Sequence, residues 1–132
     1  MRIALDSSVL IAASISRAGV CAQLLEDILT HHELVVSKFI LDELARTLDE
    51  KFNFPQTEIR LLRRFLEGVS SVVVPSEVAA GTCRDPTDLA VLGTAVAGEA
   101  KILVSVDKDL LAVADYQGIA IIKPGAFWHR TF

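Results

Sequence analysis

The stretch Lys101-Ile-Leu-Val-Ser-Val106, which runs directly into Asp107, gives the clearest indication of the fold class. It is a nearly continuous apolar run that is too short for a helix, and such runs are typical of strands buried on both faces of a parallel sheet. Similar runs occur at residues 3–5, 34–36, 72–74 and 119–122. We therefore predict an α/β fold, a three-layer α/β/α sandwich around a central, mainly parallel sheet of four or five strands.

Segments with helical periodicity lie between these runs, so that strands and helices alternate along the chain. Ser37 can cap a helix over residues 38–51, and Pro55 suits the first turn of a helix that ends near residue 67. Asp85-Pro86 can supply the cap and the first-turn proline of another helix, with Gly98 near its end. The other helices are expected over 8–15, 19–30 and 108–114. Because no linker interrupts this alternation, residues 1–132 are predicted to form a single domain.

The composition is that of a folded chain. Its 132 residues are 52% hydrophobic and 23% charged, which excludes a disordered chain. The formal net charge of −4 excludes a broad basic surface for non-specific nucleic-acid binding. Uncharged runs are well short of the roughly 20 residues that cross a bilayer, and no signal-peptide cleavage site is evident, so we expect no membrane partner and a cytoplasmic location. Cys21 and Cys83 have no zinc-ligand spacing and are expected to be buried and reduced.

Acidic side chains stand where an open parallel sheet binds its ligands. Asp6 and Asp107 directly follow two buried strands, and the carboxyl ends of such strands border the ligand-binding crevice. Glu43 lies beside the apolar stripe of its helix, and Asp88 lies in the first turn of another helix. Each acid also has a simpler interpretation. The strand-end aspartates can cap the helices that follow, Asp88 can interact with the helix dipole, and Glu43 can pair with Arg46.

Four carboxylates that meet at one edge of a sheet would not stay charged without cations, because neighbouring like charges raise each other's pKa. Oxygen ligands without a nearby His or Cys favour a hard cation, Mg²⁺ or Mn²⁺. Such ions can activate a water molecule and stabilise the leaving oxyanion of a phosphodiester. If the four acids converge, the pattern indicates metal-dependent phosphodiester hydrolysis.

Four segments that contain these acids stand in order along the chain: Ile3-Ala-Leu-Asp-Ser-Ser-Val-Leu-Ile11, Val36-Ser-Lys-Phe-Ile-Leu-Asp-Glu-Leu44, Arg84-Asp-Pro-Thr-Asp-Leu-Ala90 and Leu103-Val-Ser-Val-Asp-Lys-Asp-Leu-Leu111. They resemble motifs of the PIN-domain ribonucleases, most of all the small prokaryotic, VapC-like toxins of toxin–antitoxin pairs. The resemblance implies a PIN-like fold and a Mg²⁺- or Mn²⁺-dependent endoribonuclease in which a metal-activated water hydrolyses RNA. It also implies a cognate antitoxin partner and a homodimer.

The same resemblance assigns roles to particular residues. Ser8 and Ser105 match family positions that line the metal pocket, although Ser8 stands where the family more often has Asn. Asp85 and Asp109 are additional acids that can act as outer or alternative ligands, or can stabilise the starts of their helices. The residues assigned to catalysis and metal binding are Asp6, Glu43, Asp88 and Asp107.

Basic residues occur in two groups. Arg60, Arg63 and Arg64 share one predicted helix, where they form either a solvated face or a surface for an anionic partner, RNA phosphate or an acidic peptide. Exposed Leu and Phe side chains between residues 52 and 66 would suit a dimer. The basic residues nearer the acidic motifs, which are candidates for contacts with RNA phosphates, are Lys38, Arg46 and Arg84.

Two alternatives to a toxin stay open. The first is a non-catalytic α/β binding or regulatory module such as a receiver-like domain, but this would need an acceptor Asp after the third strand, where the chain has Val74-Pro-Ser-Glu77. A phosphatase of the haloacid dehalogenase type is disfavoured as well, because it would need an Asp at the position of Ser8. The second alternative is an RNA-processing PIN nuclease outside toxin–antitoxin systems, which would use the same four acids.

Overall fold

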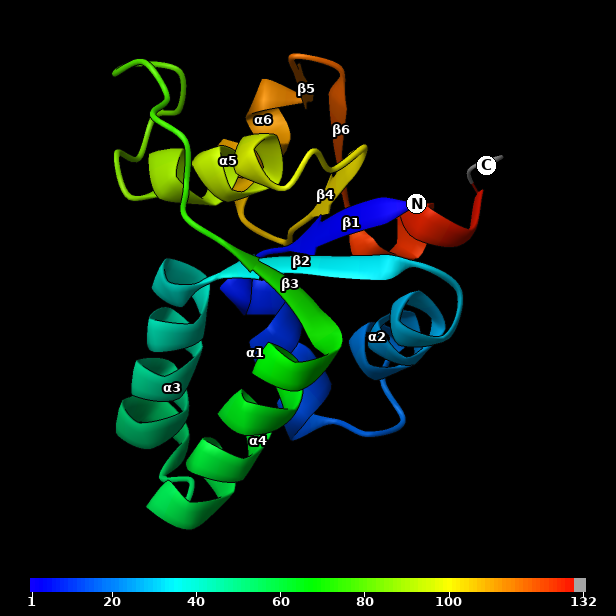
Figure 1. Cartoon of the computed structure of the whole chain (residues 1–132), viewed down its shortest axis with the longest axis vertical. Coiled ribbons are helices and arrows are strands. Elements are labelled where there is room, and N and C mark those ends of the chain that lie inside the picture. Colours follow the sequence, from blue (N-terminus) through cyan, green and yellow to red (C-terminus); the bar gives the residue numbers. More distant parts are fainter. Residues whose placement is uncertain (130–132) are drawn as a thin grey trace.

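A computed structural model describes residues 1–129 of the chain and places helices on both faces of a central sheet (Figure 1). Helices α1 (Ser7–Ile15), α2 (Val20–His31), α3 (Lys38–Phe52) and α4 (Gln56–Val69) lie on one face, and α5 (Asp88–Ala97) and α6 (Lys108–Val113) lie on the other. A 3-10 helix, η1 (Pro124–His129), follows the last strand. The predicted three-layer α/β/α architecture is confirmed.

The order of the strands creates a switch point in the middle of the sheet. The order is β3-β2-β1-β4-β6-β5, and all neighbours are parallel except β5 and β6. The chain moves from β1 outward to β2 and β3, and then returns to the other side of β1 for β4. Open α/β sheets bind ligands at the carboxyl ends of strands where the order reverses in this way. The strands are β1 (Arg2–Leu5), β2 (Glu33–Ser37), β3 (Ser70–Val73), β4 (Ile102–Val104), β5 (Asp115–Tyr116) and β6 (Ile119–Ile122).

The expected number of four or five strands is wrong, because the sheet has six strands within residues 1–129. The missing strand is β5, which consists of Asp115 and Tyr116 only and is too short to leave an apolar pattern in the sequence. A turn at Gln117 and Gly118 returns the chain antiparallel onto β6. Both turn residues have positive φ angles, 50° and 82°, as a tight hairpin of this kind requires.

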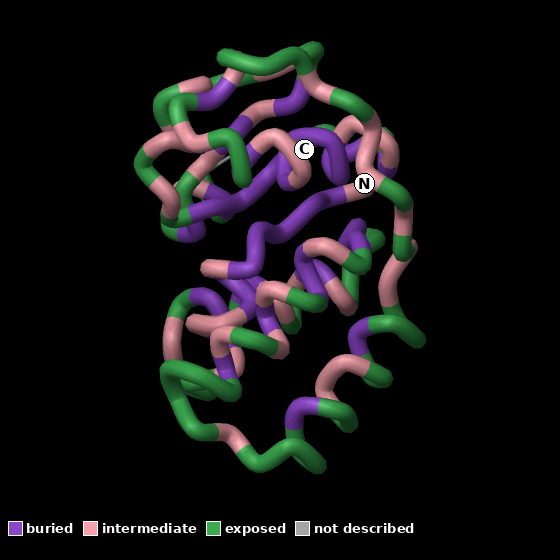
Figure 2. Tube along the Cα trace, turned by 90° about the vertical axis from the view of Figure 1, so that its left-hand side faces the viewer, coloured by how far each residue is buried: buried purple, intermediate pink, exposed green. Residues whose placement is uncertain are grey.

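The core lies along the central strands and the inner faces of the helices (Figure 2). The side chains of Ile3, Leu34 and Leu103, one from each central strand, have no exposed surface. The start of α3 is fixed as predicted, because the Ser37 hydroxyl accepts a hydrogen bond from the Ile40 backbone N–H at 3.3 Å. The predicted apolar stripe of α3 is also buried, and its fully enclosed members are Ile40, Leu41, Leu44 and Leu48.

Two further expectations concern the membrane and the cysteines. Within residues 1–129, no single helix has both the length and the apolar composition of a membrane span, and α1 and α2 meet that test only as a pair bent by 109°. Cys21 and Cys83 are both buried and form no disulfide, as predicted.

Candidate metal centre

Asp6 directly follows β1, and hydroxyl groups from two parts of the chain hold its carboxylate. Ser105 donates to Oδ2 at 2.7 Å and Ser8 donates to the same oxygen at 3.0 Å, whereas Ser7 reaches Oδ1 at 3.4 Å. The side chain is buried and occupies the N-cap position of α1, yet it makes no capping hydrogen bond. Capping therefore does not explain Asp6, and its Oδ1 keeps most of its capacity to accept another partner.

Asp107 does cap the helix that follows it. Its Oδ1 accepts hydrogen bonds from the backbone N–H groups of Asp109, at 2.7 Å, and Leu110, at 3.3 Å. The buried Ser105 hydroxyl, which donates to Asp6, also accepts the Asp107 N–H at 2.9 Å and so ties the two strand ends together. Because both capping bonds use Oδ1, the capping interpretation accounts for only one of the two Asp107 oxygens.

Asp88 is the first residue of α5, and its carboxyl group is poorly satisfied. The residue is 6% exposed, and its Oδ2 has no hydrogen-bond partner within residues 1–129. Burial, followed by the negative charges of Asp107, Asp85, Asp6 and Asp109, raises the pKa of Asp88 from 3.8 to about 7. A carboxylate stabilised by the helix dipole would have a lowered pKa. Burial and the neighbouring charges therefore outweigh any stabilisation of Asp88 by the helix dipole, and a buried oxygen without a partner is left for a ligand.

Glu43 approaches the same edge of the sheet from α3. It is half-buried, and burial together with the charge of Asp6 raises its pKa, whereas Arg46 and a hydrogen bond from Ser7 lower it. Arg46 thus acts on Glu43 through its charge, although the two form no ion pair among the described residues, and the pKa of Glu43 still shifts upward. Ser7 was missed in the sequence analysis. It is a buried hydroxyl between two acids, and only the packing of α1 against α3 brings it to Glu43.

Asp85, Asp88 and Asp109 each have a carboxylate oxygen within 4.8 Å of the others and form a group that could hold a metal ion. Two of these residues were expected only as outer or alternative ligands. Oδ1 of Asp85 accepts two hydrogen bonds from Thr87, one from the backbone N–H at 3.0 Å and one from the threonine hydroxyl at 2.9 Å. Because of this turn, α5 begins at Asp88, two residues after Pro86, the expected first residue of the helix. Asp85 therefore shapes the turn and also belongs to the acidic group.

The segment between β3 and α5 brings Asp85 to the site, and it crosses α5 at a glycine. The Ser76 N–H donates to the Gly93 carbonyl oxygen at 2.9 Å, and a Cβ at Gly93 would lie only 2.2 Å from the Ser76 carbonyl oxygen. Glycine is therefore needed for this close approach. The same segment places Cys83 near the acids, and burial followed by the charge of Asp88 raises the pKa of its thiol. No sequence pattern had indicated this position for Cys83.

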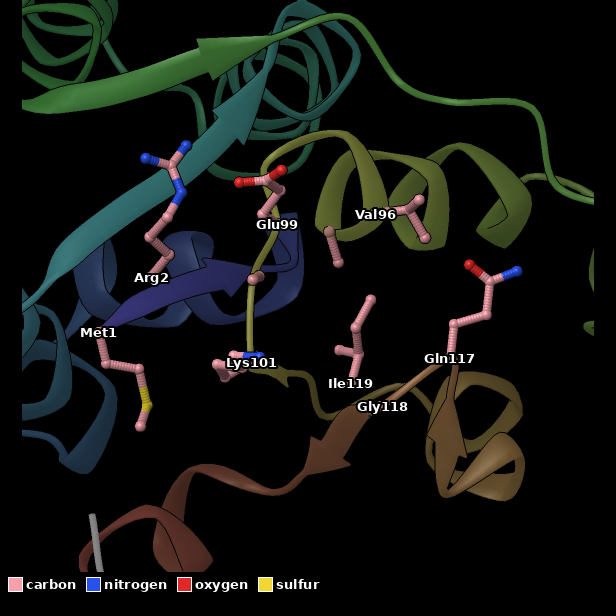
Figure 3. A pocket seen from close by; sticks show the side chains of 10 residues that line it. Met1, Arg2, Val96, Glu99, Lys101, Gln117, Gly118 and Ile119 are labelled. Carbon is pink, nitrogen blue, oxygen red and sulfur yellow. The ribbon is translucent and has the colours of Figure 1, made fainter.

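The remaining predicted site residues lie on the surface. Lys38, Arg46 and Arg84 are all exposed, and Lys38 begins α3 directly after the carboxyl end of β2. A cavity of about 760 Å³ is found at the opposite edge of the sheet, where Arg2, Lys101 and other residues line it at the amino ends of β1, β4 and β6 (Figure 3). None of the predicted site residues lines this cavity. The acids at the carboxyl ends therefore remain the candidate site.

A divalent cation fits the acidic group. The donors are carboxylate oxygens supported by hydroxyl groups, a set that suits Mg²⁺ or Mn²⁺ and gives little affinity for softer ions. The unpartnered Oδ2 of Asp88 offers one ligand atom, and the repulsion that raises its pKa would be relieved by a positive charge. The fold and the site thus define an α/β domain with a group of acidic side chains, a candidate cation site, at the switch point of its sheet.

A family model described as PIN domain matches residues 2–109. The chain therefore belongs to the PIN-domain family, which confirms the resemblance drawn from the four motifs. The fold is similar to that of VapBC2 from Rickettsia felis, which was solved bound to a DNA fragment from its promoter. The sequence identity is 14%, the TM-score is 0.65, and the match covers 93% of this chain and 98% of that one. It is also similar to VapBC-1 from nontypeable Haemophilus influenzae, with 15% identity, coverage of 95% and 99% and a TM-score of 0.64.

A third similar structure is FitAcB from Neisseria gonorrhoeae, with 18% identity, coverage of 97% of this chain and 99% of that one, and a TM-score of 0.54. At these identities the likeness establishes the fold and carries no residue-level assignment. No curated protein sequence matches the chain. Family membership also disfavours the receiver-like alternative, because residues 2–109 include all four acidic motif positions.

Proposed function

We propose that the chain is a cytoplasmic endoribonuclease that depends on Mg²⁺ or Mn²⁺ and acts as the toxin of a toxin–antitoxin pair. PIN domains are generally nucleases. The observation that carries the proposal is the buried carboxyl group of Asp88, which has an unpartnered oxygen and a pKa near 7. Such an arrangement lowers the stability of the folded chain at neutral pH, whereas a bound cation would neutralise it. A metal site is therefore the simplest reason for the arrangement.

In this proposal Asp6, Glu43, Asp88 and Asp107 hold the metal, directly or through water. A bound divalent ion supplies an activated water and neutralises the charge that develops on the phosphodiester. The chain's own hydroxyl groups orient the acids, since Ser105 and Ser8 fix Oδ2 of Asp6 and leave its Oδ1 for the site. Asp85 and Asp109 lie close enough to Asp88 to act as outer ligands. The exposed residues proposed to contact RNA phosphates are Lys38, Arg46 and Arg84.

The proposed partners follow from the fold. The similar structures from Rickettsia felis and Haemophilus influenzae are VapBC proteins, and this likeness supports an antitoxin partner for the present chain. We also propose a homodimer, as the family resemblance implies. An RNA-processing role outside toxin–antitoxin systems would use the same chemistry, so the two roles are separated by the effect of the protein on growing cells and not by its site.

The test is cleavage of a mixed cellular RNA pool by the purified protein in Mn²⁺, with the products resolved on a denaturing gel and their ends mapped. The wild type is compared with Asp6→Asn, with an EDTA-treated sample, and with Asp115→Asn, which removes an exposed carboxylate from β5. We expect discrete products from the wild type and from Asp115→Asn only. The loss of activity should be large, because Asp6 is a buried ligand candidate and Asp115 is not.

Equal cleavage by wild type and Asp6→Asn would show that a contaminating nuclease, or another site, is responsible. RNA left intact by every variant, with no effect of Mn²⁺ on thermal stability, would overturn the metal-site proposal itself. Induced expression in a bacterial host tests the toxin role. Arrested growth with the wild type, but not with Asp6→Asn, supports a toxin, and normal growth despite cleavage in vitro supports an RNA-processing nuclease.

A further inference from the structure

Two buried hydroxyl groups form a chain of hydrogen bonds between α5 and the start of α3. Thr94 of α5 and Ser37, which ends β2 and caps α3, have no exposed surface. Their hydroxyl oxygens lie 2.8 Å apart. The Thr94 oxygen also lies 2.8 Å from the carbonyl oxygen of Ala90, one turn earlier in α5, and the Ser37 oxygen accepts the Ile40 N–H at 3.3 Å. The chain thus runs from Ile40 through Ser37 and Thr94 to Ala90.

Only one arrangement of hydrogens satisfies all three contacts, because each hydroxyl group carries a single hydrogen. The carbonyl oxygen of Ala90 only accepts, so Thr94 donates its hydrogen to that oxygen. The hydrogen between the two hydroxyls is then donated by Ser37, whose oxygen at the same time accepts the Ile40 N–H. Each hydroxyl therefore donates once and accepts once, and neither buried group is left unsatisfied. Removal of either hydroxyl would leave the other without its partner in the neighbouring element.

The packing of α5 against the sheet does not itself require these hydroxyls. Valine has nearly the same shape as threonine and would fill the position of Thr94 without the cost of burying a polar group. The distance between α5 and β2 is limited elsewhere, because a Cβ at Gly98 would clash with a methyl group of Val35. A hydrogen bond adds direction to such a contact. It fixes the position of α5 along its own axis, which a close contact at one point does not.

The two hydroxyls stand at matching positions relative to two of the candidate metal ligands. Asp88 lies six residues before Thr94 in α5, and Glu43 lies six residues after Ser37, in α3. Six residues span about 9 Å of α-helix, so the hydrogen bond lies less than two turns from each acid. A shift of α5 against Ser37 would be carried along the helix to Asp88 and would move it relative to Glu43. Ligand groups bind an ion well only when they are held to within about 0.5 Å.

We propose that Thr94 and Ser37 are positioning residues, whose mutual hydrogen bond fixes α5 against the start of α3 and so sets the separation of Asp88 and Glu43 for cation binding. The two helices lie on opposite faces of the sheet (Figure 1), and the hydroxyl pair joins these layers beside the acidic centre. The inference rests on the metal site proposed above. If the pair served stability alone, its loss would lower the melting temperature and leave the cation affinity of the folded chain unchanged.

The test measures Mn²⁺ binding to the full chain after treatment with EDTA and its removal, well below the melting temperature of every variant. The electron paramagnetic resonance signal of free Mn²⁺ reports the bound fraction. We expect Thr94→Val to raise the dissociation constant about tenfold, the low end of what the loss of supporting hydrogen bonds costs at metal sites, because Thr94 contacts no proposed ligand directly. Thr94→Ser keeps the hydroxyl and should bind Mn²⁺ within about twofold of the wild type.

Three further variants make the test specific. Ser37→Ala breaks the same bond from the other side, and it keeps the inference testable if Thr94→Val does not fold. Because both substitutions remove one shared bond, the double variant should bind Mn²⁺ no more weakly than the weaker single variant. Thr30→Val removes a comparable 2.8 Å bond, from a hydroxyl to the Glu26 carbonyl oxygen within α2, and should bind as the wild type does. Ile28→Val, at a fully buried position of α2, should lower stability but not Mn²⁺ affinity.

Different results would overturn the inference and the proposed function. Equal Mn²⁺ affinity in the wild type and Thr94→Val would overturn the positioning role alone and leave the metal site in place. The same would follow if Ile28→Val weakened Mn²⁺ binding as much as Thr94→Val does, because affinity would then follow stability. Absence of Mn²⁺ binding by the wild type would overturn the metal site and the positioning role together. Mn²⁺ binding that depends on Thr94, without cleavage of RNA, would support the positioning role and contradict the nuclease.

Discussion

Replacement of Asp88 by Asn should abolish a pH-dependent loss of stability in the metal-free protein. Burial and four neighbouring acids raise the pKa of this group from 3.8 to about 7. Between these values the folded chain keeps a proton that the unfolded chain has lost. The free energy of unfolding therefore falls as the pH rises through this window. Below this pH window Asp88 is protonated in both the folded and the unfolded chain. Above the window, the folded chain bears the full cost of an ionised Asp88.

The size of this cost follows from the pKa difference. A difference of a little over three pH units corresponds to about 4 kcal/mol at about 1.4 kcal/mol per unit. Relaxation of the site and entry of water reduce such penalties, so we expect a measured effect of about 1–3 kcal/mol. At about pH 8, Asp88→Asn should be more stable than the wild type by this amount, and at about pH 5 the two should differ by about 1 kcal/mol or less.

The assay is urea denaturation in EDTA at several values between about pH 5 and pH 8, for the wild type, Asp88→Asn and the exposed control Asp115→Asn. Other groups also titrate in this range. Burial lowers the pKa of His32, which makes stability rise with pH, and burial raises the pKa of Glu43, which makes it fall. Subtraction of the Asp88→Asn curve from the wild-type curve leaves mainly the contribution of Asp88. Parallel curves for these two proteins would refute the electrostatic account of the site.

Three further predictions follow from the same contacts. Mn²⁺ should raise the melting temperature of the wild type more at about pH 8 than at about pH 5, since the ionised site binds the cation, and the gain should be much smaller in Asp88→Asn. Gly93→Ala should lower the free energy of unfolding by about 1–3 kcal/mol in urea titrations, because the alanine Cβ would overlap the backbone oxygen of Ser76. Gly125→Ala should change this free energy far less, because its Cβ meets no atom within 4 Å. Ser105→Ala should cost about 1–3 kcal/mol by removing one buried and one partly buried hydrogen bond. Ser14→Ala, which removes one bond within its own helix, should cost clearly less in the same titration.

The fold was predictable where the chain is buried on both faces. The runs at residues 3–5, 34–36 and 119–122 become strands because only a central or covered strand keeps apolar side chains on both sides of the sheet. The third run was placed less well, since β3 is Ser70–Val73 and begins two residues before the valines. An edge strand is fixed by its backbone ladder with β2, which serine supports as well as valine does. Apolar pattern alone therefore marks central strands better than edges.

The acidic centre was predictable to a different degree for each residue. Asp6 and Asp107 could be placed because parallel strands bring their carboxyl ends to one edge of the sheet. The close approach of Asp85 and Asp109 to Asp88 could not be placed, because it depends on the path of the segment before α5 and on its contact with Gly93. Periodicity describes the faces of helices and strands, but it says nothing about where a segment without repeating structure crosses its neighbours.

The hydrogen bonds of the three buried or half-buried aspartates argue against a purely structural role for the group. Asp6 receives three hydroxyl contacts, Asp107 uses one oxygen as a helix cap, and Asp88 has an oxygen with no partner at all. If helix capping were the only role of these residues, the fold would satisfy each of them and would keep them apart. It instead brings them to the switch point between β1 and β4, two strands that end in buried residues. The core thus stabilises an arrangement of like charges, and the divalent cation proposed for this site would remove their repulsion.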